Sequence, residues 1–235
     1  MTTGKRISLI ALLSIAVAGV ISPSAHAAAT RYITVSAQGT VKVVPDAVRI
    51  NATATSVAAT SKEALAATAK TATAVRAALK TAKIDTKDIA TQSVSVYPEY
   101  KYTNDGGSTL TGYRGSQSFT ITVRAADTAG SLVDALVAAG GDNLQINGAT
   151  PFVLDSTKSL EAARAAAVKS AKAKATSYAK LMGVKLGKVN YLVENSSPTN
   201  YTPVMGVAKA ESDATVIDLG QQDVSISVTV QWSLL

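Results

Sequence analysis

The sequence predicts an α+β fold, in which helices cover one face of a mainly antiparallel sheet. Segments with strand-like alternation occur in pairs, and helix-like segments separate the pairs, giving the order β-β-α-β-β-α-β-α-β-β. The helix-like segments each have a single narrow apolar stripe, so each is expected to cover a sheet on one side only. The middle of the chain, Val48–Leu154, has the β-α-β-β-α-β order of a split βαβ unit.

Residues 1–27 have the features of a signal peptide. Lys5 and Arg6 precede an apolar run, Ile7–Ile21, and Ala25-His26-Ala27 supplies a small-x-small cleavage site. We therefore expect an exported protein, periplasmic or otherwise in the cell envelope or outside the cell, whose residues 28–235 form one domain. The apolar run is too short for a typical membrane-spanning helix, so no integral span is expected after cleavage.

Composition excludes several kinds of chemistry. The chain has no cysteine, and its single histidine, His26, lies in the signal peptide. The mature chain then lacks Ser-His-Asp triads, cysteine nucleophiles, zinc sites built on His or Cys, haem ligation by His and thiol redox chemistry. We expect no cofactor and no metal. Loss of Lys5 and Arg6 with the signal peptide lowers the formal net charge from +7 to +5, which suits an anionic polymer or surface as a partner and also simply favours solubility.

The first strand pair lies before residue 55. Alternating residues run from Arg31 to Ala37 and resume at Val41–Val43, and a second strand covers Val48–Ala54. Before Pro45-Asp46 the odd-numbered residues are predicted to face inward, and after it the even-numbered residues are. This change predicts a bulge at Val44–Asp46.

A helix and a hairpin follow. Thr60-Ser61-Lys62-Glu63 is a capping box, and the helix that it opens is predicted to bury Leu65, Ala69, Ala72, Val75 and Leu79. Strands around Val94–Tyr102 and Phe119–Ala125 flank the turn cluster at residues 104–108, so they are expected to form a long hairpin.

The last third of the chain contains the longest helix. After a short helix within residues 127–140 and a strand at Leu144–Leu154, the stretch from Lys158 is helical up to the capping Gly183. Its alanine-rich stripe requires a close approach by another element. The residues expected on it are Leu160, Ala163, Ala167, Ala171, Tyr178, Leu181 and Met182. Strands at Val189–Val193 and Val224–Leu234 flank the aperiodic segment Asn195–Gln222.

Charged groups are expected to have ordinary roles. Lysines on the opposite face of the long helix form either a solvated face or a site for acidic polymers; they are Lys158, Lys169, Lys172 and Lys180. No base-stacking pattern of aromatic residues is interleaved with them, so nucleic acid is not expected as a partner. Two carboxylate pairs, Asp85 with Asp88 and Glu211 with Asp213, suit turns and caps better than catalysis or calcium binding.

Tyrosines concentrate around the predicted hairpin. Tyr97, Tyr100, Tyr102 and Tyr113 are four of the chain's eight tyrosines, and aromatic enrichment marks contact surfaces as well as cross-strand pairs. The aperiodic segment carries further apolar residues, including Tyr201, Val204 and Met205. We take these seven residues as the predicted interaction surface, and replacing Val204 and Met205 with aspartate is expected to weaken association.

Five stretches in order are distinctive: ITVSAQGTVKVVPDAVRI, IDTKDIATQSVSVYPEYKY, LTGYRGSQSFTITV, EAARAAAVKSAKAKATSYAKLMGVKLGKV and DVSISVTVQWSL. Together they resemble the SIMPL-domain family, which includes periplasmic oxidative-stress defence proteins and a periplasmic immunogenic protein. The family's Gly-x-Gly near the first strand is Ala37-Gln38-Gly39 here, with one glycine missing. The resemblance implies an envelope protein, often oligomeric, with a link to stress tolerance and no assigned catalytic residue.

Three classes of function follow. The first is a non-enzymatic envelope protein that forms a homo-oligomer or binds another envelope protein or an anionic polymer. The second is a carboxylate-dependent hydrolase, which requires two facing acids in a cleft. The third is a carrier of a small ligand or polyanion. The missing nucleophiles and the resemblance favour the first.

Overall fold

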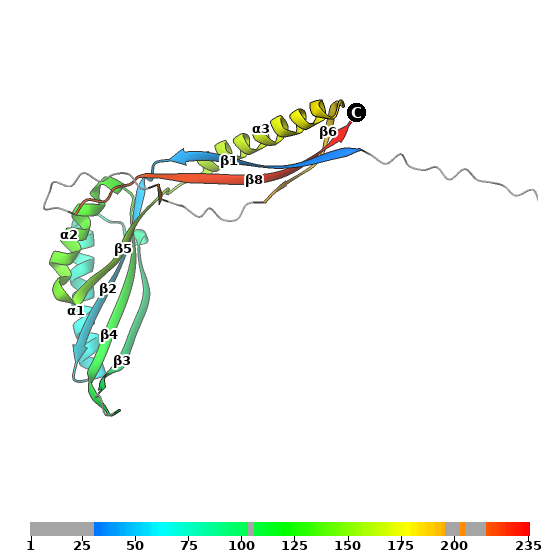
Figure 1. Cartoon of the computed structure of the whole chain (residues 1–235). Coiled ribbons are helices and arrows are strands. Elements are labelled where there is room, and N and C mark those ends of the chain that lie inside the picture. Colours follow the sequence, from blue (N-terminus) through cyan, green and yellow to red (C-terminus); the bar gives the residue numbers. More distant parts are fainter. Residues whose placement is uncertain (1–30, 103–105, 196–202, 205–214) are drawn as a thin grey trace, which may run out of the picture.

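The α+β fold class is confirmed, but the strands form two antiparallel sheets instead of one (Figure 1). The structure, a computed structural model, describes residues 31–102, 106–195, 203–204 and 215–235. We call the two sheets the terminal sheet (β1, β8, β6 and the short β7) and the central sheet (β3, β4, β2, β5). The strands are β1 Tyr32–Val43, β2 Ala47–Ala58, β3 Ile89–Tyr102, β4 Ser108–Val123, β5 Leu144–Phe152, β6 Leu186–Glu194, β7 Pro203–Val204 and β8 Gln221–Leu234; the α-helices are α1 Ser61–Thr81, α2 Ala129–Gly140 and α3 Thr157–Leu181.

The terminal sheet joins the two ends of the described chain. β1 and β8 pair along their whole length, from Tyr32 opposite Ser233 to Val43 opposite Gln222. Both strands alternate strictly, so one face is apolar and buried while the other is polar. The helix α3 lies on the apolar face (Figure 1). Hydroxyl pairs such as Ser36 with Thr229 line the uncovered face.

A glycine allows α3 to approach β1 closely. A Cβ atom at Gly39 would lie 2.2 Å from both the Ala163 carbonyl oxygen and the Ala167 nitrogen. This contact is the close approach that the alanine stripe predicted. The stripe continues through Ala171, Ala175 and Ala179, all buried. The one glycine retained from the family's Gly-x-Gly is therefore the one that α3 requires.

The prediction for the end of this stripe was wrong. Tyr178, Leu181 and Met182 are exposed, because the buried stripe runs through alanines four residues apart and, at 100° per residue, moves about 40° around the helix with each step. Large side chains on that face would hold the helix away from Gly39.

The central sheet contains the predicted split βαβ order, β2-α1-β3-β4-α2-β5, with strands arranged β3-β4-β2-β5. The helices α1 and α2 lie on one face of this sheet (Figure 1). The predicted capping box at Thr60 and Glu63 is present. The predicted hairpin is also confirmed, since β3 and β4 pair from Ile89 to Tyr102.

The helix α1, like α3, packs closely against a strand at a glycine. A Cβ atom at Gly115 would lie 2.5 Å from the Thr68 hydroxyl and 2.7 Å from the Ala64 carbonyl oxygen. Ala64 and Thr68 are therefore buried, whereas Leu65 and Ala69, predicted to be on the inner stripe, are exposed. The first half of the helix presents its small residues to β4 because only they fit against this glycine.

The predicted bulge at Val44–Asp46 is wrong. Residues 44–46 are the loop between β1 and β2, which belong to different sheets, so the parity changes because the chain changes sheets. The Asp46 carboxylate accepts a hydrogen bond from the Leu154 backbone nitrogen at 2.7 Å. This bond joins the loop to the chain that leaves the central sheet for α3.

Candidate interaction surface

The hairpin tyrosines lie on an exposed strand edge, but they do not share one face. β3 is an edge strand of the central sheet, and three of its side chains, Tyr97, Tyr100 and Tyr102, are exposed. Strand alternation places Tyr97 on one face and the other two on the opposite face. Tyr113 on β4 lies opposite Pro98 and is only half-buried.

The aperiodic segment is described in part. Tyr201 and Met205 lie outside the described residues, and of Val204 only the backbone is described, in β7 opposite Gln221. Its later part, from Thr215 onward, begins beside α2, where the Thr215 nitrogen and hydroxyl donate hydrogen bonds to the Asp134 carboxylate. Ile217 and Leu219 contact the core.

The β6 edge is an apolar surface that the sequence analysis did not nominate. β6 lies at the end of the terminal sheet and pairs with β8 on one side only among the described strands. Exposed side chains project from both of its faces: Val189, Tyr191, Leu192 and Val193. An ion pair between Arg164 of α3 and Glu194, with 2.9 Å between Nε and Oε2, joins the end of β6 to the helix.

α3 covers β1 and β8 but leaves the face of β6 beside it open. A groove of about 480 Å³ lies there, lined by Val168, Lys172 and Thr176 of α3 and by β6 and β8 residues that include Leu192 and Trp232. In the sequence, the only sign of this surface was the largely apolar run Val189–Val193, between the long helix and the final strand. It predicted a strand, but edge position depends on the pairing order.

The four lysines predicted to share one face of α3 are all exposed, as expected of a solvated helix face: Lys158, Lys169, Lys172 and Lys180. Among the described residues, none of these four lies within ion-pair distance of a carboxylate. Their arrangement indicates a positively charged side of the terminal sheet.

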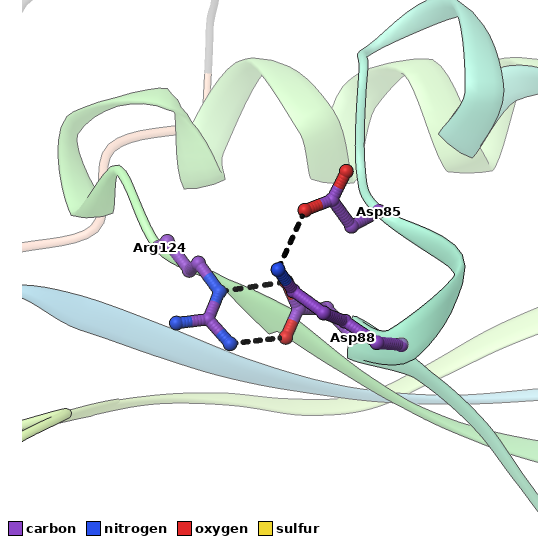
Figure 2. A network of polar contacts seen from close by, with 4 residues as sticks. Asp85, Asp88 and Arg124 are labelled. Carbon is purple, nitrogen blue, oxygen red and sulfur yellow. Dashed lines mark hydrogen bonds and ion pairs between the residues drawn. The ribbon is translucent and has the colours of Figure 1, made fainter.

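The Asp85 and Asp88 carboxylates are held by cations and do not face each other as a catalytic pair (Figure 2). Asp88 accepts hydrogen bonds from Arg124 Nε at 2.7 Å and Nη2 at 2.8 Å. Asp85 forms an ion pair with Lys87 at 3.1 Å. The two hydrogen bonds from the Arg124 guanidinium lower the pKa of Asp88. The Asp88 carboxylate therefore stays ionised and is unsuited to be a general acid. The Glu211–Asp213 pair lies outside the described residues.

The Asp88–Arg124 pair predicts a pH-dependent stability. Because the folded-state pKa of Asp88 is lowered, the pair stabilises the fold above the unfolded pKa of about 3.9, and this stabilisation is lost as the pH falls through the folded-state value. Asp88→Asn is expected to lower the free energy of unfolding by on the order of 1 kcal/mol at pH 7, and this deficit is expected to shrink as the pH falls below about 3.9. Urea unfolding at several pH values measures this. Asp85→Asn, in an exposed pair, is the control, and a deficit for Asp88→Asn that persists unchanged at low pH would contradict the assignment.

In the part of the chain that the structure describes, no three metal-ligating side chains come together. None of the helices there is both long and apolar enough to cross a bilayer.

The geometry thus defines an α+β protein with two helix-backed sheets and exposed apolar strand edges. A family model, SIMPL, described as "Protein of unknown function (DUF541)", matches residues 33–232 and so spans both sheets. The chain belongs to the SIMPL family.

Three curated proteins are similar to it. The "26 kDa periplasmic immunogenic protein" of Brucella melitensis biotype 1 and that of Brucella abortus are each 30% identical over 157 residues, which are 61% of this chain and 61% of the relative. An "Uncharacterized protein YggE" of Edwardsiella ictaluri is 30% identical over 131 residues, 53% of each chain. The match therefore spans about three fifths of the Brucella relatives. None of these names describes an enzymatic activity.

Proposed function

We propose that this protein is an exported, non-enzymatic protein of the cell envelope that acts through self-assembly or partner binding and contributes to stress tolerance. The signal-like N-terminus and the periplasmic names of the Brucella relatives support export. The carboxylates of Asp85 and Asp88 are each held in an ion pair with a different cation, which does not favour the carboxylate-dependent hydrolase alternative.

The β6 edge carries the proposal. An edge strand offers unpaired backbone N–H and C=O groups, and proteins usually protect such an edge with charges, proline or a covering element. β6 has a charged residue near each end, Lys188 and Glu194, but between them it carries four exposed apolar or aromatic side chains on its two faces: Val189, Tyr191, Leu192 and Val193. An added strand from a second copy would pair with this backbone and cover these side chains at the same time. Tyr97, Tyr100 and Tyr102 on the β3 edge form a second candidate contact.

The decisive experiment changes apolar side chains on both faces of β6. Leu192 and Val193 are each 48% exposed, so replacing both with aspartate is expected to leave the fold intact while it places charge in any assembled contact. The assembled mass, measured by size-exclusion chromatography with light scattering at tens of micromolar, is expected to fall to that of the monomer.

Val137 on α2 supplies the matched control. It is a similarly exposed apolar residue, at 46%, but it lies on a helix away from either edge. Val137→Asp is expected to assemble like the parent protein. A parent protein that is already monomeric, or a double variant that assembles like the Val137→Asp control, would refute self-assembly through β6.

A further inference from the structure

One pocket on the central sheet contains two basic side chains, Arg76 and Lys80, for which the described residues supply no acidic partner. It has a volume of about 400 Å³ and lies between α1 and the start of the edge strand β3. Its lining consists of Arg76 and Lys80 from α1, Ile84 and Thr86 from the connection to β3, and Ile89 and Thr91 from β3 itself. Arg76 and Lys80 are four residues apart on a helix, so both side chains project on the same side of α1.

Two contacts position the guanidinium of Arg76, an exposed residue of α1, in the absence of a ligand. Its Cζ atom lies 5.2 Å from the centre of the Phe119 ring, a side chain that is only 1% exposed. Its Nη2 donates a hydrogen bond to the Thr91 hydroxyl at 3.2 Å. A cation held over a buried ring and by a neighbouring hydroxyl loses little conformational freedom on binding an anion.

The charges around this pocket are unbalanced. In the described part of the chain, no carboxylate lies within 4.0 Å of the Arg76 or Lys80 nitrogens. The neighbouring acids do not neutralise them, because Asp85 is paired with Lys87 and Asp88 with Arg124. A guanidinium has five N–H donors, and only one is used by Thr91.

We infer that this pocket binds a phosphoryl group, as part of a small phosphate ester. The arginine fork matches two phosphate oxygens, and the lysine ammonium adds a point charge from the next helical turn. The Thr86 and Thr91 hydroxyls are further polar groups in the same pocket, and Ile84 and Ile89 give it apolar walls for the carbon part of the ester. This site is on the central sheet and does not depend on self-assembly through β6.

Isothermal titration calorimetry with inorganic phosphate and with glycerol 3-phosphate tests the site in the full exported chain, and glycerol and acetate serve as ligand controls. Saturable binding of both phosphates is expected, and tighter binding of the ester would show that the apolar walls contribute. Arg76→Gln and Lys80→Gln are each expected to weaken binding by about tenfold or more. Arg76→Lys keeps the positive charge but loses the paired N–H donors of the guanidinium, so it is also expected to weaken phosphate binding.

Lys70→Gln provides the matched control, because Lys70 is an exposed lysine of the same helix that does not line the pocket. It is expected to bind both phosphates like the parent protein. Thermal unfolding checks that each variant is folded. Absence of saturable phosphate binding, equal binding by acetate, or an equal loss in Lys70→Gln and Arg76→Gln would overturn the inference. A monomeric protein that binds phosphate would refute the proposed assembly and leave this site standing.

Discussion

Replacing Gly39 with valine is expected to destabilise the terminal sheet by about 3 kcal/mol or more. The new Cβ atom would lie 2.2 Å from backbone atoms of Ala163 and Ala167, which cannot rotate away as a side chain could. The helix α3 would have to move off β1, and the buried contacts of its alanine stripe would be lost with it.

The single tryptophan of the chain gives this experiment a local probe. Trp232 is buried in the core between α3 and the terminal sheet, so its fluorescence during urea unfolding follows that sheet. Gln38→Ala, on the neighbouring exposed position of β1, is the control and is expected to change stability by less than about 0.5 kcal/mol. Equal urea midpoints for Gly39→Val and Gln38→Ala would show that α3 does not depend on this contact.

Phe119→Ala is expected to cost about 3–5 kcal/mol in the central sheet. Phe119 is among the largest fully buried side chains, and it lies in a core cluster shared by β2, β4, α1 and α2. Its removal leaves a cavity that the rigid strands around it cannot fill by collapse.

The two sheets have separate core clusters, so this substitution should affect them unequally. Far-ultraviolet circular dichroism, which reports the whole chain, is expected to show an early transition in Phe119→Ala, while Trp232 fluorescence changes at a higher urea concentration. Coincident and equally shifted transitions would show instead that the two sheets unfold as one unit.

Much of the fold could be predicted from local patterns. The strict alternation of Val224–Leu234 indicated β8, and the capping box at Thr60 gave the start of α1. The alanine stripe from Ala163 onward predicted a close helix contact, which the structure confirms at Gly39. These features depend on residues that are near one another in sequence, where the period of side chains follows directly from backbone geometry.

Local sequence patterns predicted only some of the candidate surfaces. Tyr97, Tyr100 and Tyr102 stood out by composition, and the structure places them on an edge strand. The β6 edge did not stand out, because the sequence Val189–Val193 is typical of any strand. Arg76 was likewise one basic residue among many until α1 was placed beside Thr91 and Phe119.

Local periodicity and capping are sufficient to predict the α+β class, the order of helices and strands and the face that most of them bury. Tertiary contacts were needed to show that the strands divide into two sheets, that residues 44–46 change sheets without a bulge, and which strands remain at edges. Strand partners are chosen by contacts between distant segments, such as Tyr32 with Ser233 at the two ends of the described chain. No local pattern contains that information, since alternation shows that a strand has a buried face but not which strand lies beside it.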